Sequence, residues 1–549
     1  MRRSLLKLLL LYLSFSLMLP FAGAQQRKAS KTANISKPKL IVLIVIDQFR
    51  DDYLSRFDNL FGQRGFKRLL TKGAYFSNAN YTYAGTKTAA GHATIVSGSI
   101  PAIHGIIANK WYDREVGAVK ESVADPKLDS SSPWKLLTST IGDQLRMSNN
   151  YQSKVVSISM KDRSAVLMAG RNGSGAYWFD LQKGGFISGS YYQKDSPNWV
   201  DNFNNRRIPD SFFQKKWEKI LSEDAYSIAD RDDAPYEEGW QSSAFPHTIA
   251  GNGKLDRNFY EHFRSSPFAN GYLEEFAEAA ISAERLGKGN YTDMFAISFS
   301  STDYIGHRFG PYSHEVQDTM VRMDATVERF LDFLDKHIGL DKTLVAFTSD
   351  HGICPVPAYS ELHSLGGHRI GGDKLKERIE RLLDERFGDA NYLLSLVNHQ
   401  VYLDEKVLEQ KRLNISEVEE IVGKEAVKVA GIANYYTRSR LLSGNIASTD
   451  TLGNQVFKSF HPKRSGNVYL IVEPFSLIAE FEDETRGTDH GTPYHYDTHV
   501  PIIFMGASIK AGVYRGVCSP SDIAPTIASI LSIEAPNGSV GRILSEALK

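Results

Sequence analysis

Short apolar runs, most of which stop at a polar or charged residue, recur along the chain. Nearly continuous apolar character is typical of strands that are buried on both faces. The pattern therefore predicts five core strands. They are KLIVLIVI (39–46), KVVSISM (154–160), MFAISFS (294–300), TLVAFTS (343–349) and HVPIIFMG (499–506).

Helical patterns lie between these runs, and the longest, HEVQDTMVRMDATVERFLDFLDKHI (314–338), repeats apolar residues at intervals of three and four. Alternating strands and helices predict an α/β fold with a mostly parallel central sheet flanked by helices. Ligands bind at the carboxyl ends of the strands in such sheets. Asp47, Lys161, Asp303 and Asp350 follow four of the predicted strands, so we expect the functional site there.

Two long stretches interrupt this alternation. Residues from about 172 to 290 are rich in Trp, Tyr, Asn, Asp and Gly, and residues from about 355 to 465 mix charged helices with turns. Strands of the core type resume after each stretch. We therefore expect one catalytic domain over 38–549, with these two stretches as insertions that shape access to the site.

The first residues read as a targeting segment. Residues 1–24 have a basic start, an apolar run too short to span a bilayer comfortably, and small residues at Ala22 and Ala24. We interpret them as a cleaved secretory signal, followed by a linker over 25–37. The sequence thus predicts an exported protein, periplasmic in a bacterium or secreted, with no membrane anchor after cleavage.

Composition narrows the possible partners. Lys and Arg together number 64, as do Asp and Glu, so no overall field favours nucleic acid or an anionic membrane. Only Cys354 and Cys518 are present, which excludes a disulfide framework and leaves open whether these two pair.

Asp and His residues gather at or near the expected strand ends. A single pair would fit a helix cap or a surface loop, but several clusters at successive strand ends favour a metal site over caps. Carboxylate oxygen and imidazole nitrogen are ligands that zinc accepts. The residues are Asp303 and His307, Asp350 and His351, and His490, His495 and His499.

The stretch TKTAAGHAT (86–94) places two threonines before small and apolar residues. Ser and Thr at a helix start are mostly caps, and taken alone that interpretation is preferred. Thr88 nevertheless precedes a predicted helix, whose first N–H groups favour a phosphoryl anion.

Five ordered motifs resemble those of the alkaline phosphatase superfamily, in its nucleotide pyrophosphatase/phosphodiesterase branch. The resemblance runs from about residue 38 to about 535. The motifs are IVLIVIDQFR, TKTAAGHATIVSGSIPAIHGIIANKWYD, STDYIGHRFGP, TSDHG and DHGTPYHYDTHVPIIFMG.

The resemblance implies two Zn²⁺ ions and a threonine nucleophile, Thr88. Thr88 would attack phosphorus and form a phosphothreonine, and water would then hydrolyse this intermediate. Thr86 would be a cap or turn residue, and Asn109 would donate to a phosphoryl oxygen. One zinc would be held by Asp47, Asp350, His351 and Thr88, and the other by Asp303, His307 and His490. His495 and His499 remain candidates for supporting the metal ligands or the fold, and we assign no role to Lys87 and His92.

SMKDR (159–163) carries Lys161 and Arg163 two positions apart at a strand exit. If the strand conformation persists, both project to the same side. Composition alone favours two solvated cations. The pair also resembles the Lys-x-Arg of the monoesterase members of this branch, the phosphate-irrepressible PafA-type alkaline phosphatases. We therefore predict a phosphomonoesterase acting on small-molecule phosphate monoesters, and by resemblance a monomer.

Other classes fit less well. The alternative within the branch is a nucleotide pyrophosphatase/phosphodiesterase. A sulfatase needs C/S-x-P-x-R, which the position of Thr88 lacks, and a cofactor-independent phosphoglycerate mutase would be cytoplasmic and use serine. A non-catalytic zinc-containing binding protein would favour closed Cys and His sites.

Overall fold

The computed structural model describes residues 37–128, 130–240, 242–479 and 485–549. The predicted signal, and all of the predicted linker except Lys37, lie outside these ranges. Among the described residues, no helix combines the length and the apolar character needed to cross a bilayer. Cys354 and Cys518 are buried free thiols.

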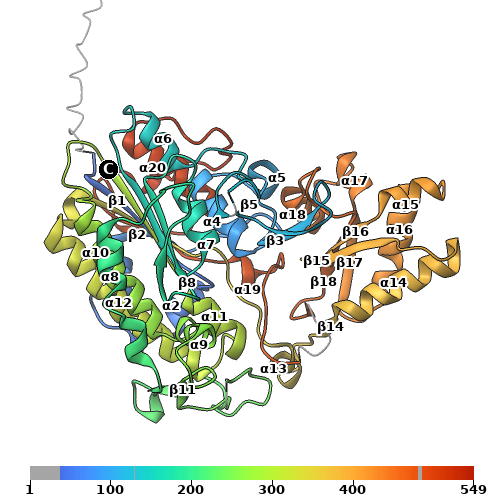
Figure 1. Ribbon diagram of the computed structural model, residues 1–549, viewed down its shortest axis with the longest axis horizontal. Coiled ribbons are helices and arrows are strands. Elements are labelled where there is room, and N and C mark those ends of the chain that lie inside the picture. Colours follow the sequence, from blue (N-terminus) through green and yellow to red (C-terminus); the bar gives the residue numbers. More distant parts are fainter. Residues whose placement is uncertain (1–36, 129, 241, 480–484) are drawn as a thin grey trace, which may run out of the picture. The chain divides into compact units, whose positions relative to one another are not determined.

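A nine-stranded sheet forms the centre of the fold (Figure 1). All five predicted core strands belong to it, as β1, β7, β12, β13 and β20. Across the sheet the order is β21 (Gly512–Tyr514), β2 (Gly73–Phe76), β20 (Ile502–Gly506), β13 (Thr343–Thr348), β1 (Leu40–Ile46), β12 (Asp293–Phe299), β7 (Val155–Ser159), β8 (Gly175–Asp180) and β9 (Gly185–Ile187).

Strand β1 is buried on both faces, which explains its unbroken apolar sequence. It runs parallel to β12 and β13. Because side chains alternate along a strand, Val42 and Ile44 enter one apolar core while Leu43 and Val45 enter the other. Helices cover both faces (Figure 1): α10 (Phe268–Ala283) and α12 (His314–His337) lie on one, and α4 (Thr88–Ser97), α7 (Asp162–Ala169) and α20 (Ile523–Leu531) on the other. The helix predicted over 314–338 is confirmed as α12.

Strand β20 runs antiparallel to both of its neighbours, β13 and β2. Its first residue, Ile502, pairs with Thr348, the last residue of β13. The segment that enters β20 therefore lies at the same sheet edge as the residues that leave β1 and β13. For this reason the histidines before β20 can join a site formed by residues that follow other strands.

The first interrupting stretch, 172–290, is not wholly an insertion. Its strands β8 and β9 complete one edge of the central sheet, and its helix α10 packs on that sheet. The aromatic sequence GAYWFD of β8 is buried like the aliphatic strands, although this stretch was expected to be an insertion outside the core strands. Outside the central sheet, the stretch 172–290 also forms the strand pair β10 (Lys215–Trp217) and β11 (His247–Ile249), and helix α9 (Arg257–Arg264).

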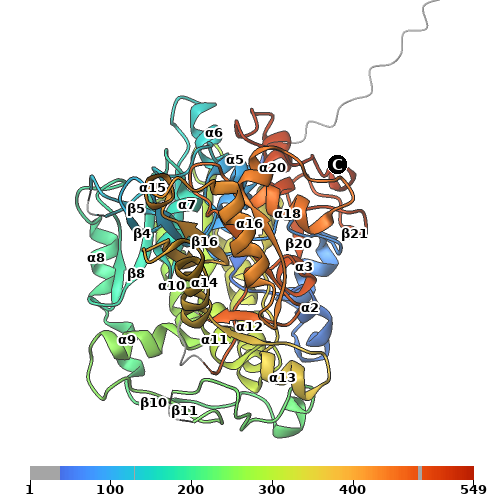
Figure 2. The same cartoon turned by 90° about the vertical axis from the view of Figure 1, so that its right-hand side faces the viewer.

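The second stretch, 355–465, forms most of a separate layer with its own apolar core. Its antiparallel sheet also takes in a strand beyond residue 465, in the order β15 (Leu393–Val397), β16 (Gln400–Leu403), β18 (Val468–Val472) and β17 (Ile432–Thr437). Helices α14 (Gly372–Phe387) and α16 (Ile415–Ala426) pack against this sheet (Figure 2). A further short strand, β19 (Leu477–Ala479), pairs with β14 (Arg369–Gly371).

Candidate active site

The Asp and His residues predicted as ligands meet at one edge of the central sheet. Asp47 follows β1, and Asp350 and His351 follow β13. Asp303 and His307 lie one turn apart on α11 (Ser301–Phe309), which follows β12. His490 lies in the loop before α19 (His495–Thr498).

The first set consists of Asp47, Asp350 and His351, whose ligand atoms lie within 4.8 Å of one another. Nε2 of His351 is 3.4 Å from Oδ1 of Asp47 and 3.4 Å from Oδ2 of Asp350. It is also 3.3 Å from Oγ1 of Thr88. These two carboxylate oxygens are buried and accept no hydrogen bond from the described residues. Buried carboxylate oxygens without donors are costly, so they fit a bound cation.

The second set is centred on Asp303. Its Oδ1 lies 3.1 Å from Nε2 of His307 and 3.7 Å from Nε2 of His490. The rings of His490 and His351 stack with their centroids 3.5 Å apart, so the two sets are adjacent. Burial, and then the neighbouring His351, lower the pKa of His490, and burial lowers the pKa of His351. Both rings are therefore held neutral, which is the state that binds metal.

Backbone carbonyls orient the three imidazoles. Nδ1 of His307 lies 2.8 Å from the carbonyl of Thr488. Nδ1 of His351 lies 2.9 Å from the carbonyl of Gly352, and Nδ1 of His490 lies 2.6 Å from the carbonyl of Thr86. A carbonyl accepts, so in the neutral ring Nδ1–H donates and Nε2 faces the cluster with a free lone pair. This is the arrangement expected of metal-binding histidines. Among the described residues, the first set is one of three groups with the spacing needed to hold a metal ion. The other two groups, Asp303 with His351 and His490, and His307 with Asp489 and His490, share the residues of the second set. Carboxylate oxygen and imidazole nitrogen are donors that zinc accepts.

Thr88 is the first residue of α4 and is buried beside the first set. Thr86, expected as a cap or turn residue, does not cap this helix: its Oγ1 donates to the carbonyl of Thr492 at 3.0 Å. The backbone N–H of Ala89 is instead satisfied by Oδ1 of Asn109, at 2.8 Å. Because that oxygen is occupied, the amide NH₂ of Asn109 is left to donate into the cavity that Asn109 lines with Thr88.

Lys161 and Arg163 reach the site by different routes, because the strand conformation does not persist. Strand β7 ends at Ser159, and α7 begins after Lys161. The buried ammonium of Lys161 lies 2.7 Å from Oδ2 of Asp47 and 2.5 Å from Oδ2 of Asp303. Burial alone would lower the pKa of Lys161, but the charges of Asp303 and Asp47 raise it by more, so its pKa lies above the ordinary value. Arg163 lines the cavity beside Thr88 and Asn109.

Three neighbouring residues had no predicted role. Nζ of Lys87 lies 2.9 and 3.0 Å from the carboxylate oxygens of Asp489, which shares a potential metal group with His307 and His490. Asp489 begins an Asp-His-Gly triplet, as Asp350 does, and that repeat is a sequence signal for it. Nδ1 of His92 lies 2.8 Å from the carbonyl of Thr88, and its Nε2 lies 2.9 Å from Oγ of Ser298, so His92 links α4 to β12.

His495 and His499 lie apart from the two candidate metal sets. Their rings pack against each other at an angle of 35°, with centroids 4.3 Å apart. Nε2 of His499 is 3.2 Å from the carbonyl of Ser77 and 3.8 Å from a carboxylate oxygen of Asp51. These contacts agree with a structural role.

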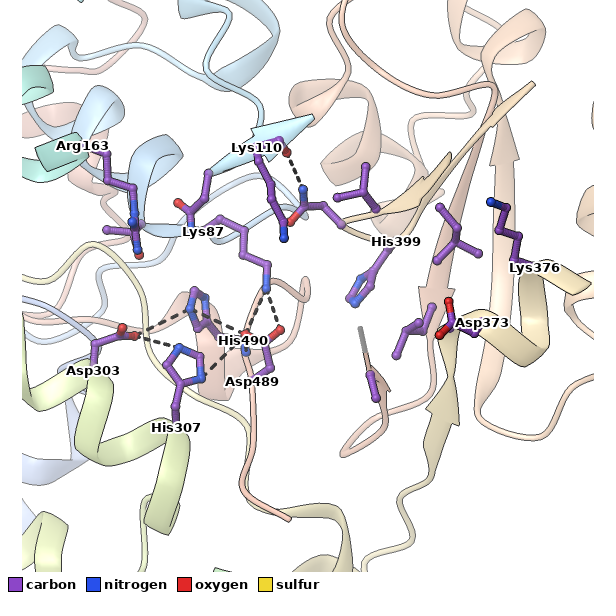
Figure 3. A pocket seen from close by; sticks show the side chains of 18 residues that line it. Lys87, Lys110, Arg163, Asp303, His307, Asp373, Lys376, His399, Asp489 and His490 are labelled. Atoms are coloured by element: carbon purple, nitrogen blue, oxygen red, sulfur yellow. Dashed lines mark hydrogen bonds and ion pairs between the residues drawn. The ribbon is translucent and has the colours of Figure 1, made fainter. Parts of the chain in front are cut away.

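Thr88 lines a cavity of about 260 Å³. Figure 3 shows the side chains around this cavity. Asp303, His307, Asp489, His490 and Lys87 form one side of it in the figure. The opposite side comes from the second interrupting stretch and includes His399, Asp373 and Lys376. The site therefore combines a nucleophile candidate, two acidic and imidazole sets, and cations around one cavity.

Comparison with known proteins agrees with this geometry. Residues 41–494 match the family model of type I phosphodiesterase / nucleotide pyrophosphatase. The alkaline phosphatase PhoV of Synechococcus elongatus is 35% identical over 99% of this chain and 100% of its own. A relative from Myroides odoratus, named a calcium-transporting ATPase, is 36% identical over 94% of this chain and 95% of its own.

The alkaline phosphatase PafA of Elizabethkingia meningoseptica is 34% identical over 95% of this chain and 96% of its own. A crystal structure of wild-type PafA superposes with a TM-score of 0.88, covering 94% of this chain and 100% of that one at 34% identity. A PafA variant with one threonine changed to serine, and an asparagine, a lysine and an arginine changed to alanine, gives a TM-score of 0.87.

Proposed function

The chain belongs to the type I phosphodiesterase/nucleotide pyrophosphatase family of the alkaline phosphatase superfamily, and we propose that it is an exported, zinc-dependent alkaline phosphatase that hydrolyses phosphate monoesters. One observation carries the choice of monoesters: Arg163 and Asn109 line the same cavity as Thr88. A monoester presents more negative charge on its non-bridging oxygens than a diester, and an Arg fork can bind two of them.

Thr88 is the proposed nucleophile. Its Oγ1 would form a bond to phosphorus while the bond from phosphorus to the ester oxygen breaks, giving a phosphothreonine and the free alcohol. Water would then cleave the phosphothreonine and release inorganic phosphate. The first N–H groups of α4 and the NH₂ of Asn109 would donate to the phosphoryl oxygens, and Arg163 would add a charged fork.

Two zinc ions are proposed, one held by Asp47, Asp350, His351 and Thr88 and the other by Asp303, His307 and His490. Zinc held there would supply a lowered pKa at the threonine hydroxyl and at the attacking water, and positive charge beside the departing oxygen. The backbone carbonyls behind the three histidines hold the ligand nitrogens in place. Lys161, between Asp47 and Asp303, would set the local charge and contact the phosphoryl group with Arg163.

The residue types altered together in the PafA variant are Thr, Asn, Lys and Arg. Thr88, Asn109, Lys161 and Arg163 are the same four types and surround one site here. This parallel supports their assignment to nucleophile and phosphate contacts.

The test is the rate on a monoester and a diester that share a leaving group, 4-nitrophenyl phosphate and methyl 4-nitrophenyl phosphate. We expect kcat/KM to favour the monoester by about 100-fold or more, because the diester loses one or two charge-assisted contacts. A wild-type enzyme that favours the diester would move the assignment to a nucleotide pyrophosphatase/phosphodiesterase.

Export is proposed from residues 1–24. Amino-terminal sequencing of the protein from a bacterial periplasmic or culture fraction should begin at or near Gln25. Full-length protein retained in the cytoplasm would contradict this proposal.

A further inference from the structure

The cavity in front of Thr88 has a second wall that takes no part in the proposed phosphoryl chemistry. Six residues from β15, β19 and the turn after β15 form this wall, which we call the insertion wall. They are Leu396, Val397, Asn398, His399, Ile478 and Ala479. Four of these side chains are aliphatic. The opposite wall carries Thr88, Asp303, His307 and His490, so a phosphoryl group at Thr88 would direct its ester substituent toward the insertion wall.

The insertion wall is anchored directly to the catalytic segment. Asn398 and His399 form the two-residue turn between β15 and β16, and both have positive φ, 49° and 61°. Nδ2 of Asn398 donates to the carbonyl of Lys110 at 2.5 Å. Lys110 follows Asn109, whose side chain holds the first turn of α4. This chain of contacts fixes the distance between the turn and Thr88.

His399 adds a polar ring to this wall, which also carries Asn398 and is flanked on the same side of the cavity by Asp373 and Lys376. Its ring projects into the cavity across from Lys87 and Asp489 (Figure 3). Only 8% of the residue is exposed. Burial, and then the charge of Lys87, lower the pKa of His399 to about 4. At neutral and alkaline pH the ring is uncharged and offers one donor and one acceptor.

Cavity size limits what fits. Pockets that enclose drug-sized ligands measure roughly 300–1,000 Å³. The 260 Å³ here must hold both the phosphoryl group and its substituent. That volume suits one ring or a short chain.

From these observations, and resting on the proposed phosphatase activity, we propose that the insertion wall is the binding site for the leaving group. It would favour monoesters of compact alcohols or phenols with an apolar face. Leu396 and Ile478 would contact that face, and the ring of His399 would pack against it or hydrogen-bond to a polar substituent.

The experiment compares phenyl phosphate with methyl phosphate, which has the same phosphoryl group and almost no apolar surface. His399→Asn removes the ring and keeps a residue that tolerates positive φ, so the turn should fold. Leu396→Ala shortens the apolar wall. We expect each variant to lower kcat/KM for phenyl phosphate by about tenfold relative to wild type, with less than about twofold change for methyl phosphate.

Leu365→Ala, an exposed leucine of the same insertion away from the cavity, is the control and should affect neither substrate. Inhibition by inorganic phosphate should be unchanged in His399→Asn, because phosphate alone does not reach this wall. Equal losses on both substrates, or none on either, would overturn the leaving-group assignment. A wild-type preference for diesters would overturn the proposed function instead, whatever the variants do.

Discussion

Nζ of Lys161 lies 2.7 Å from Oδ2 of Asp47, and both side chains are almost completely buried. The same ammonium contacts Asp303, so it touches one carboxylate from each candidate metal set. A buried Lys in this position keeps its charge because its carboxylate partners offset the cost of desolvation. Its charge therefore lies at the candidate active site and not at the protein surface.

We predict that replacing Lys161 and Arg163 together by Ala will lower kcat/KM for monoesters far more than for diesters. Each lost charge-assisted contact should cost on the order of 2 kcal/mol, and a diester has less charge to lose. Steady-state kinetics on the matched monoester and diester measure the difference. Lys154→Ala, at the other end of β7 and paired with Glu284, is the control and should change neither rate. Equal losses on both esters would contradict a monoester-specific role.

Thr88 is predicted to carry the phosphate. After the enzyme is quenched with substrate at low pH, peptide mapping should place the modification on Thr88, and Thr88→Ala should be inactive. Thr86→Ala should stay active and lose only the hydrogen bond to Thr492, at a cost of about 1 kcal/mol of stability. Phosphate on Thr86, or undiminished turnover by Thr88→Ala, would show that the nucleophile is another residue.

The two acidic and imidazole sets are predicted to hold two zinc ions. Chelation should abolish activity, and Asp350→Ala and His307→Ala should each reduce both bound zinc and activity, because each removes a ligand atom from one set. Elemental analysis of the purified proteins measures the metal. His499→Ala should retain zinc, since that ring contacts Ser77 and His495. Full activity in a zinc-free protein would refute the prediction.

Gly91 should be essential for the position of the nucleophile. A Cβ at Gly91 would lie 2.2 Å from the backbone oxygen of Asp350, so Gly91→Ala must push α4 away from the end of β13. We expect kcat to fall at least about tenfold, since small misplacements of reacting groups are costly.

The matched control is Gly271→Ala in α10, where the nearest atom to an added Cβ is 3.9 Å away. It should keep full activity and gain up to about 1 kcal/mol of stability from helix propensity. A fully active Gly91→Ala enzyme would contradict this prediction, because it would show that α4 can accept a larger side chain beside Asp350 without displacing Thr88.

Sequence reasoning could locate residues whose positions follow from burial. Strands such as β1 are buried on both faces, so their apolar runs and the polar residues that end them are visible in the sequence. The direction of β20 was not visible, because an apolar run reads the same in either direction. Strand β8 was missed because its buried side chains are mostly aromatic, whereas the predicted core strands were recognised by aliphatic runs.

The site itself divides in the same way. That Thr88, Asp350, His351 and His490 meet at one edge of the sheet could be predicted, because each belongs to a short local motif that follows or precedes a strand. The hydrogen bond of Asn109 to Ala89 and the pairing of Lys87 with Asp489 could not, because each joins residues that only the fold brings together. The different positions of Lys161 and Arg163 depend on where β7 ends: the predicted strand reached Met160, whereas β7 ends at Ser159 and α7 begins at Asp162.

The last prediction concerns stability in acid and rests on His104. This side chain is buried, its Nδ1 accepts from the backbone N–H of Ile106 at 3.1 Å, and its Nε2 lies 3.1 Å from Oγ1 of Thr94. Burial, and then the charge of Arg464, lower the pKa of His104 to about 3. An unfolded histidine has a pKa of about 6.5. Between these values the unfolded chain binds a proton that the folded chain does not. The free energy of unfolding should therefore fall as the pH drops below about 6.5, by up to about 1.4 kcal/mol per pH unit from this residue.

His104→Asn should be less stable than wild type at pH 7.5, because it loses packing in the core. The difference should narrow as the pH falls toward 5, because the variant has no histidine here to protonate on unfolding. Urea unfolding at several pH values, with a chelator present throughout so that metal loss does not contribute, measures this difference. The exposed histidine variant His363→Asn should follow the wild-type curve. If the difference between His104→Asn and wild type stays constant or widens in acid, His104 does not control this part of the acid response.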